Sequence, residues 1–186
     1  MNARSLFTTP RCFVLVLIAV AGFCPSVNSA PQNANPASSS PSLKKELEPL
    51  TYFTGHWTCK GVFPSSGKEI ASDIVAQPDL EGSWLALRHD DAPPNRYHAT
   101  QLWGLDPQTK QFVAYIFDNF GGARKFTSPG WADTQWIWSG EPSKSEKPTS
   151  ERFVFTRMSD KELTTSYEVK RGSADWAIGD KLTCKR

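Results

Sequence analysis

The stretch Gly55-His56-Trp57-Thr58-Cys59-Lys60-Gly61 marks the point where the pattern of the sequence changes. Before it, leucines recur at helical spacing. After it, short runs of β-branched and aromatic residues alternate with turn residues as far as Arg186. Such runs, with no long helix between them, are typical of an all-β barrel or sandwich and argue against a parallel α/β sheet.

The N-terminal thirty residues have the composition of a secretory signal peptide. Arg4 and Arg11 precede an apolar run at 13–21, which is too short to span a bilayer comfortably and is followed by small polar residues. We expect cleavage after Ser29, because cleavage one residue later would place a proline next to the scissile bond. The chain is therefore predicted to be exported, to a periplasm or to the medium.

This cleavage divides the chain into three parts: a signal peptide at 1–29, a linker at 30–42 and a folded domain at 43–186. The linker is rich in Pro, Ser, Ala and Asn, a composition that buries little apolar surface and favours a flexible tether. The mature chain is predicted to contain no integral membrane segment.

Cys59 and Cys184 are the only cysteines left in the mature sequence. In an oxidising compartment two cysteines usually form one disulfide. Closing a loop of more than a hundred residues would stabilise the fold by about 4–5 kcal/mol on a chain-entropy estimate. A reactive thiol is the alternative, but no Cys-x-x-Cys motif or basic cluster supports it.

The charge of the mature chain argues against polyanionic partners. Removing the two leader arginines from 21 basic residues leaves 19, which equals the 19 acidic residues. No basic stripe is available to neutralise phosphates, so nucleic acid and anionic membrane are not expected as main partners.

The domain is predicted to begin with a short helix. Ser40 is placed as its cap and Pro41 at its first position, and Leu43, Leu47 and Leu50 form one apolar face. We expect this helix to close one end of the barrel and to cover the outside of the fifth strand, which is apolar on both faces. Ten antiparallel strands then follow, at 55–63, 69–78, 83–91, 97–104, 111–118, 123–128, 131–139, 150–158, 162–171 and 175–185.

Ten sequential strands predict an up-and-down barrel, which removes exposed edges by closing on itself. If Cys59 and Cys184 face each other on antiparallel first and last strands, Trp57 falls opposite Arg186. On the last strand, this pairing predicts that Cys184 points inward together with Trp176, Ile178, Leu182 and Arg186, which share its parity.

Two resemblances support this fold. Gly55-x-Trp57 resembles the signature that opens the first strand of lipocalins and other calycin barrels, in which the Trp closes the floor and a basic residue of the last strand packs across it. Together with Gly104-Leu105-Asp106-Pro107-x-Thr109-Lys110, it resembles an exported bacterial lipocalin-like family of unknown function. The resemblance implies a Trp57–Arg186 pair, a contact of about 0.5–2 kcal/mol.

The opening stretch through Pro64 also resembles nitrobindin-type barrels, which bind haem in a ten-stranded calycin barrel. In those proteins the axial His lies on the last strand. Here residues 178–184 contain no His. The resemblance therefore implies the fold but not haem ligation, and no cofactor is predicted.

Other polar residues give weaker signals. His89 and His98 would oppose each other in a hairpin centred on Pro93-Pro94, which makes them weak candidates for a metal site, but no third ligand is evident. His56 is expected to face outward. Asp118, Asp133 and Glu168 lie within strands, and an inward acid could act as a general base. No catalytic motif is present, so no catalytic residue is assigned and an enzyme is the less favoured class.

Aromatic residues are the remaining signal, with seven Trp, four Tyr and eleven Phe in the whole chain. They either fill the core or line a cavity for a flat, greasy ligand. The candidates for ligand contact are Trp84, Trp103, Tyr115, Trp136 and Trp138.

Three functions follow in order of preference. The first is non-covalent binding of a small hydrophobic or aromatic molecule. The second is an envelope interaction or inhibitor protein with a filled barrel acting through surface loops, its protein partner unknown. The third is a small-molecule isomerase-like enzyme.

Overall fold

The structure is a computed structural model that describes residues 41–146 and 148–186. The predicted signal peptide, most of the predicted linker and the predicted cap Ser40 lie outside these residues. In chain order the elements are a 3₁₀ helix η1 (Lys45–Phe53) and the strands β1 (Gly55–Phe63), β2 (Lys68–Asp79), β3 (Trp84–Asp91), β4 (His98–Leu105), β5 (Phe112–Asp118), β6 (Ala123–Ser128), β7 (Trp131–Ala132), β8 (Gln135–Gly140), β9 (Thr149–Ser159), β10 (Glu162–Arg171) and β11 (Ala177–Lys185).

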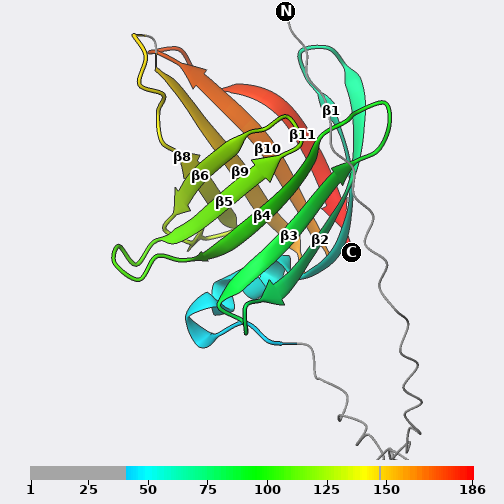
Figure 1. The fold of residues 1–186 in the computed structure, drawn as a ribbon. Coiled ribbons are helices and arrows are strands. Elements are labelled where there is room, and N and C mark those ends of the chain that lie inside the picture. The colour runs from blue at the N-terminus through cyan, green and yellow to red at the C-terminus, as the bar shows by residue number, and fades with distance from the viewer. Residues whose placement is uncertain (1–40, 147) are drawn as a thin grey trace, which may run out of the picture. The chain divides into compact units, whose positions relative to one another are not determined.

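The strands form one closed antiparallel barrel (Figure 1). Each strand pairs with its neighbour in sequence except β6, which pairs with β8 instead of β7, and β1 pairs with β11, so the ring is closed. The two-residue strand β7 adds only to β8, so ten strands make the wall. This confirms the predicted all-β, roughly ten-stranded barrel with a short N-terminal helix.

One predicted strand is divided in two. The run predicted at 131–139 turns back on itself at Asp133, which has a φ of 54°. Asp tolerates this left-handed conformation because its short polar side chain can hydrogen-bond locally. The residues before the turn form β7 and those after it form β8.

The helix η1 lies across one end of the barrel (Figure 1). It begins at Lys45, later than predicted, and the backbone N–H of Lys44 donates to Gly82 in the β2–β3 turn at 2.9 Å. Leu47, Leu50 and Phe53 of η1 are all buried in the core. The prediction that the helix also covers the outside of β5 is wrong, because Phe117 on that face remains 51% exposed.

The first and last strands join in the predicted register. Cys59 pairs with Cys184 and the two form a disulfide. The Arg186 guanidinium lies 4.5 Å from the centre of the Trp57 ring, as the register argument predicted. Arg186 also donates to backbone carbonyl groups next to η1, so it links the end of the chain to the closed end of the barrel.

A β-bulge changes the facing of residues near the start of β11. Tyr167 pairs with Asp180, but the next residue of β10 pairs with Ile178, so Gly179 is the extra residue. Ile178 is therefore 43% exposed, and Trp176 lies under Arg152, with the guanidinium 4.1 Å from the ring centre. The prediction that both side chains share the inward face of Cys184 is wrong for this reason.

Among the described residues, no helix has the length and apolar character required to cross a membrane.

Candidate functional site

The interior of the barrel contains a cavity of about 610 Å³. η1 and the aromatic core close one end of the barrel, and the loops between β3 and β4 and between β5 and β6 contribute Asn95, Arg96 and Phe120 to the cavity's other end. Phe120 is 73% exposed, so this end of the cavity meets solvent. The barrel is therefore only partly filled by its own side chains.

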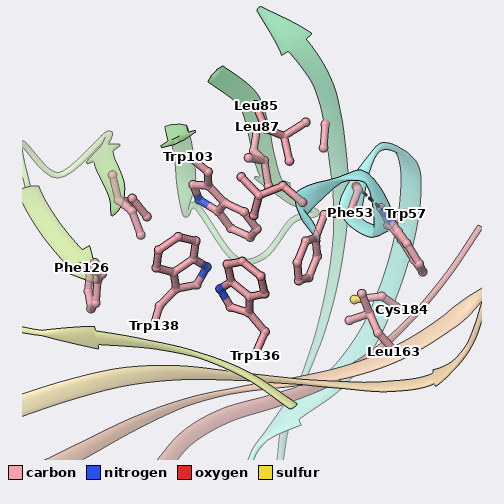
Figure 2. Close-up of a cluster of buried hydrophobic side chains, with 14 of the residues drawn as sticks. Phe53, Trp57, Leu85, Leu87, Trp103, Phe126, Trp136, Trp138, Leu163 and Cys184 are labelled. Atoms are coloured by element: carbon pink, nitrogen blue, oxygen red, sulfur yellow. Dashed lines mark hydrogen bonds between the residues drawn. The ribbon is translucent and has the colours of Figure 1, made fainter. Parts of the chain in front are cut away.

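The deep part of the cavity is apolar and aromatic. Its surface, which we call the aromatic floor, consists of Trp103, Trp138, Phe153 and Phe155. Beneath it, Phe53 of η1 packs edge to face against Trp103 and Trp136, at ring-centre distances of 5.1 and 5.7 Å. Figure 2 shows Trp103, Trp136 and Trp138 gathered around one point, with Phe53 beside them. These contacts hold the floor rigidly in place.

The buried indole N–H of Trp138 has no hydrogen-bond partner among the described residues, and neither has that of Trp136. Trp103 differs, because its N–H donates to Oε1 of Gln101 at 2.9 Å. A buried donor left unpaired costs about 1–3 kcal/mol, so such groups usually meet a protein, water or ligand acceptor. Trp138 lines the cavity, but its indole nitrogen is itself buried, so the unpaired donor belongs to the packed core beneath the cavity surface.

The five aromatic residues proposed from sequence separate into three groups. Trp103 and Trp138 line the cavity. Trp136 is fully buried in the core beneath it. Trp84 and Tyr115 lie outside the barrel and contact each other, with ring centres 6.1 Å apart. Neither of these two can contact a molecule bound inside.

One side of the cavity is polar, and we call His89, Asp91, Tyr167 and Asp180 the polar wall. The Asp91 side chain is only 3% exposed and is held by two neighbours. Ser72 Oγ donates to Asp91 Oδ1 at 2.6 Å, and His89 Nε2 lies 3.0 Å from the same oxygen. Because a carboxylate oxygen only accepts, Nε2 is the donor in this hydrogen bond.

Asp180 is the acid of the polar wall with the most perturbed titration. Burial in the barrel raises its pKa to about 6, and the negative charge of Asp91 acts in the same direction. A hydrogen bond from the backbone N–H of Tyr167 and the charge of His89 act in the opposite direction. Burial also raises the pKa of the neighbouring Tyr167 to about 12, reinforced by the charge of Glu151. A carboxyl group with a raised pKa inside a cavity is a frequent feature of functional sites.

A second polar group lies nearer the open end. Arg124 contacts Asp118 at 3.4 Å and Glu151 at 3.2 Å, so one guanidinium is shared by two carboxylates. Asp118 Oδ1 also accepts hydrogen bonds from the backbone N–H groups of Phe120 and Gly122. Asp118 therefore orders the β5–β6 loop, although it lines the cavity as well.

The predicted opposition of His89 and His98 is wrong by one residue. In the β3–β4 hairpin Asp90 pairs with His98, and His89 pairs with Ala99. A one-residue shift places the two imidazoles on opposite faces of the sheet. His98 bonds Asp90 at 2.8 Å, and among the described residues no cluster of three or more His, Cys, Asp or Glu side chains could hold a metal ion.

The remaining sequence candidates lie away from the cavity. His56 is exposed and bonds Asp73 at 2.8 Å. Glu168 pairs with Arg152, and Asp133 is exposed in the β7–β8 turn. Sequence reasoning missed Asp180, although its even number places it on the same face of β11 as Cys184 and Leu182. The alternation of the last strand was the signal that could have found it.

No protein-family model matches the chain, and no curated protein matches it. What the chain shares with known architectures is the closed, antiparallel ten-stranded barrel, which is consistent with a calycin-like fold.

Proposed function

We propose that this protein is exported and binds a small apolar, aromatic molecule non-covalently inside the barrel. The observation that carries the proposal is the cavity of about 610 Å³ with an aromatic floor. Ligand pockets in proteins are typically about 300–1,000 Å³, mostly apolar, and carry a few polar groups that orient the ligand.

The experiment fills the cavity without altering the outer surface. Thr165 is buried on β10 and lines the cavity, whereas the next residue along the strand, Thr164, faces the opposite side of the sheet. Thr165→Phe should remove binding, and Thr164→Phe is the matched control. The probe is N-phenyl-1-naphthylamine, followed by its fluorescence, with native mass spectrometry of the purified protein beside it.

Saturable one-to-one binding by the unmodified protein and by Thr164→Phe, but not by Thr165→Phe, is the expected result. Both variants should keep the circular dichroism spectrum of the parent. Equal binding by the two variants, or none by the unmodified protein, would contradict the proposal.

Export rests on the leader-like N-terminal sequence and agrees with the Cys59–Cys184 disulfide. Export is tested by the molecular mass of the chain that is recovered from outside the cytoplasm, measured by mass spectrometry. Cleavage should leave Ala30 as the first residue, and an uncut chain in the cytoplasm with free thiols would argue against export.

The second function considered from sequence, a surface-loop interaction protein, assumed a filled barrel, and the open cavity removes that assumption. The third, an isomerase-like enzyme, assumed an open cavity with a deep polar group, and the partly buried Asp180 that lines the cavity is the candidate for that group. Its test is exchange of the acidic C–H protons of 2-tetralone in D₂O. Exchange faster than in buffer, and lost in Asp180→Asn, would favour it; exchange at the buffer rate would exclude this chemistry for the probe.

A further inference from the structure

We propose that the ligand of the cavity is a cation, an aromatic or apolar body carrying a protonated amine, and that the amine binds at Asp180 on the polar wall. This inference deepens the proposed function and rests on it. It concerns the charge of the ligand, which the aromatic floor alone does not determine.

Asp180 is the carboxyl group of the cavity that lacks a side-chain partner. Among the described residues it takes part in no ion pair and no hydrogen bond with another side chain, and its hydrogen-bond partner is the backbone N–H of Tyr167. Asp91, by contrast, is held by Ser72 and His89, and Asp118 bonds Arg124. Burying an ionised carboxylate with no opposite charge beside it is unfavourable. A ligand ammonium group would supply both the opposite charge and hydrogen-bond donors.

The charges around Asp180 leave this role open to a ligand. The titratable groups that face it are Tyr167 on β10, with which it pairs, and His89 and Asp91 on β3. Two arginines line the cavity: Arg124 is already shared by two carboxylates, and Arg96 lies on the β3–β4 loop at the open end. The polar wall contains two carboxyl groups, Asp91 and Asp180, and no Lys or Arg, and an acidic wall favours cations and disfavours anions.

The shape of the cavity determines where the apolar part of the ligand lies. An ammonium group at Asp180 leaves the attached body in the space above Trp103 and Trp138. Aromatic rings favour offset or edge contacts with such a surface.

The test compares three indoles that differ only in the charge of the side chain. Tryptamine is a cation at pH 7.5, tryptophol is neutral and indole-3-propionate is an anion. Isothermal titration calorimetry uses the exported chain with its disulfide intact. A charge-assisted hydrogen bond predicts that tryptamine binds about ten- to a hundredfold more tightly than tryptophol, and that indole-3-propionate binds most weakly.

The variant Asp180→Asn keeps the shape and removes the charge. It should bring the affinities for tryptamine and tryptophol to within about twofold of each other, with tryptophol affinity nearly unchanged. The matched control is Asp133→Asn, which removes the same charge from an exposed turn outside the barrel and should keep the preference. A preference that persists in Asp180→Asn would overturn the assignment.

Lowering the pH provides an independent measurement on the unmodified protein. Because the pKa of Asp180 in the empty protein is about 6, about a tenth of the group is ionised at pH 5. Tryptamine affinity should therefore fall by up to about tenfold between pH 7.5 and pH 5, while tryptophol affinity stays level. A flat tryptamine profile would contradict the role of Asp180.

The outcomes separate the two proposals. If N-phenyl-1-naphthylamine binds but the cation is not preferred, the inference about charge fails and the proposed function stands. If neither that probe nor any of the indoles binds, the proposed function fails and the inference fails with it.

Discussion

Replacing Asp180 by Asn should stabilise the protein at neutral pH and leave its stability nearly unchanged in acid. Burial raises the pKa of Asp180 in the folded protein from its usual value of 3.8 to about 6. The folded state therefore holds a proton on Asp180 at pH values where the unfolded chain has released it. Between about pH 4 and pH 6 the folded state binds more protons, so the free energy of unfolding decreases as the pH rises.

The size of the effect follows from this pKa difference. A difference of about 2 between the folded and unfolded pKa values corresponds to about 3 kcal/mol of unfolding free energy. The unmodified protein has this stabilisation in full below about pH 4 and has lost it by pH 8. Asparagine is neutral at both pH values. Asp180→Asn should therefore raise the free energy of unfolding by up to about 3 kcal/mol at pH 8 and by close to zero at pH 4. Stabilisation on loss of a functional group is common at binding sites.

Urea denaturation followed by tryptophan fluorescence at pH 4 and pH 8 measures this difference, with the disulfide intact in both proteins. Subtracting the free energy of unfolding of one protein from that of the other at each pH removes the contributions of all other titrating groups. Asp133→Asn is the control, since Asn tolerates the positive φ of that exposed turn. An equal change at both pH values, or destabilisation at pH 8, would refute the reasoning.

Three further predictions concern stability. Replacing Cys59 and Cys184 together by Ser should lower the free energy of unfolding by about 4–5 kcal/mol, because the bond joins residues 125 apart; an unchanged urea midpoint would contradict this. Arg186→Ala should cost about 1–2 kcal/mol by removing the contact with Trp57, whereas Arg186→Lys should recover part of it in a thermal melt. Leu47→Ala should cost about 2–5 kcal/mol, since Leu47 is 1% exposed, and a denaturation curve matching the parent would show that η1 does not plug the barrel.

Several features of the fold could be predicted because they are local. Turn residues and alternating runs place nearly every strand, and antiparallel neighbours follow from short connections. The two cysteines provide one long-range constraint, and that constraint is enough to place Trp57 next to Arg186. The division of the 131–139 run was missed because its signal is a single left-handed residue, Asp133.

Errors in the candidate site come from shifts of one residue. The β3–β4 hairpin turns about Pro94 rather than between the two prolines, so His89 faces the cavity and His98 does not. The bulge at Gly179 reverses the facing of Ile178 in the same way. Because side chains alternate with a period of two, each such shift moves a residue to the other face of the sheet.

The sequence by itself determined the all-β class, the number of strands in the wall and the pairing that closes the first strand on the last. Only the tertiary structure decided that the barrel holds a cavity, and that Asp180, Asp91 and His89 meet on one wall of it. The physical reason is the range of the interactions. Strand and turn preferences act between neighbouring residues, whereas the space inside a barrel depends on how side chains from opposite strands pack across it.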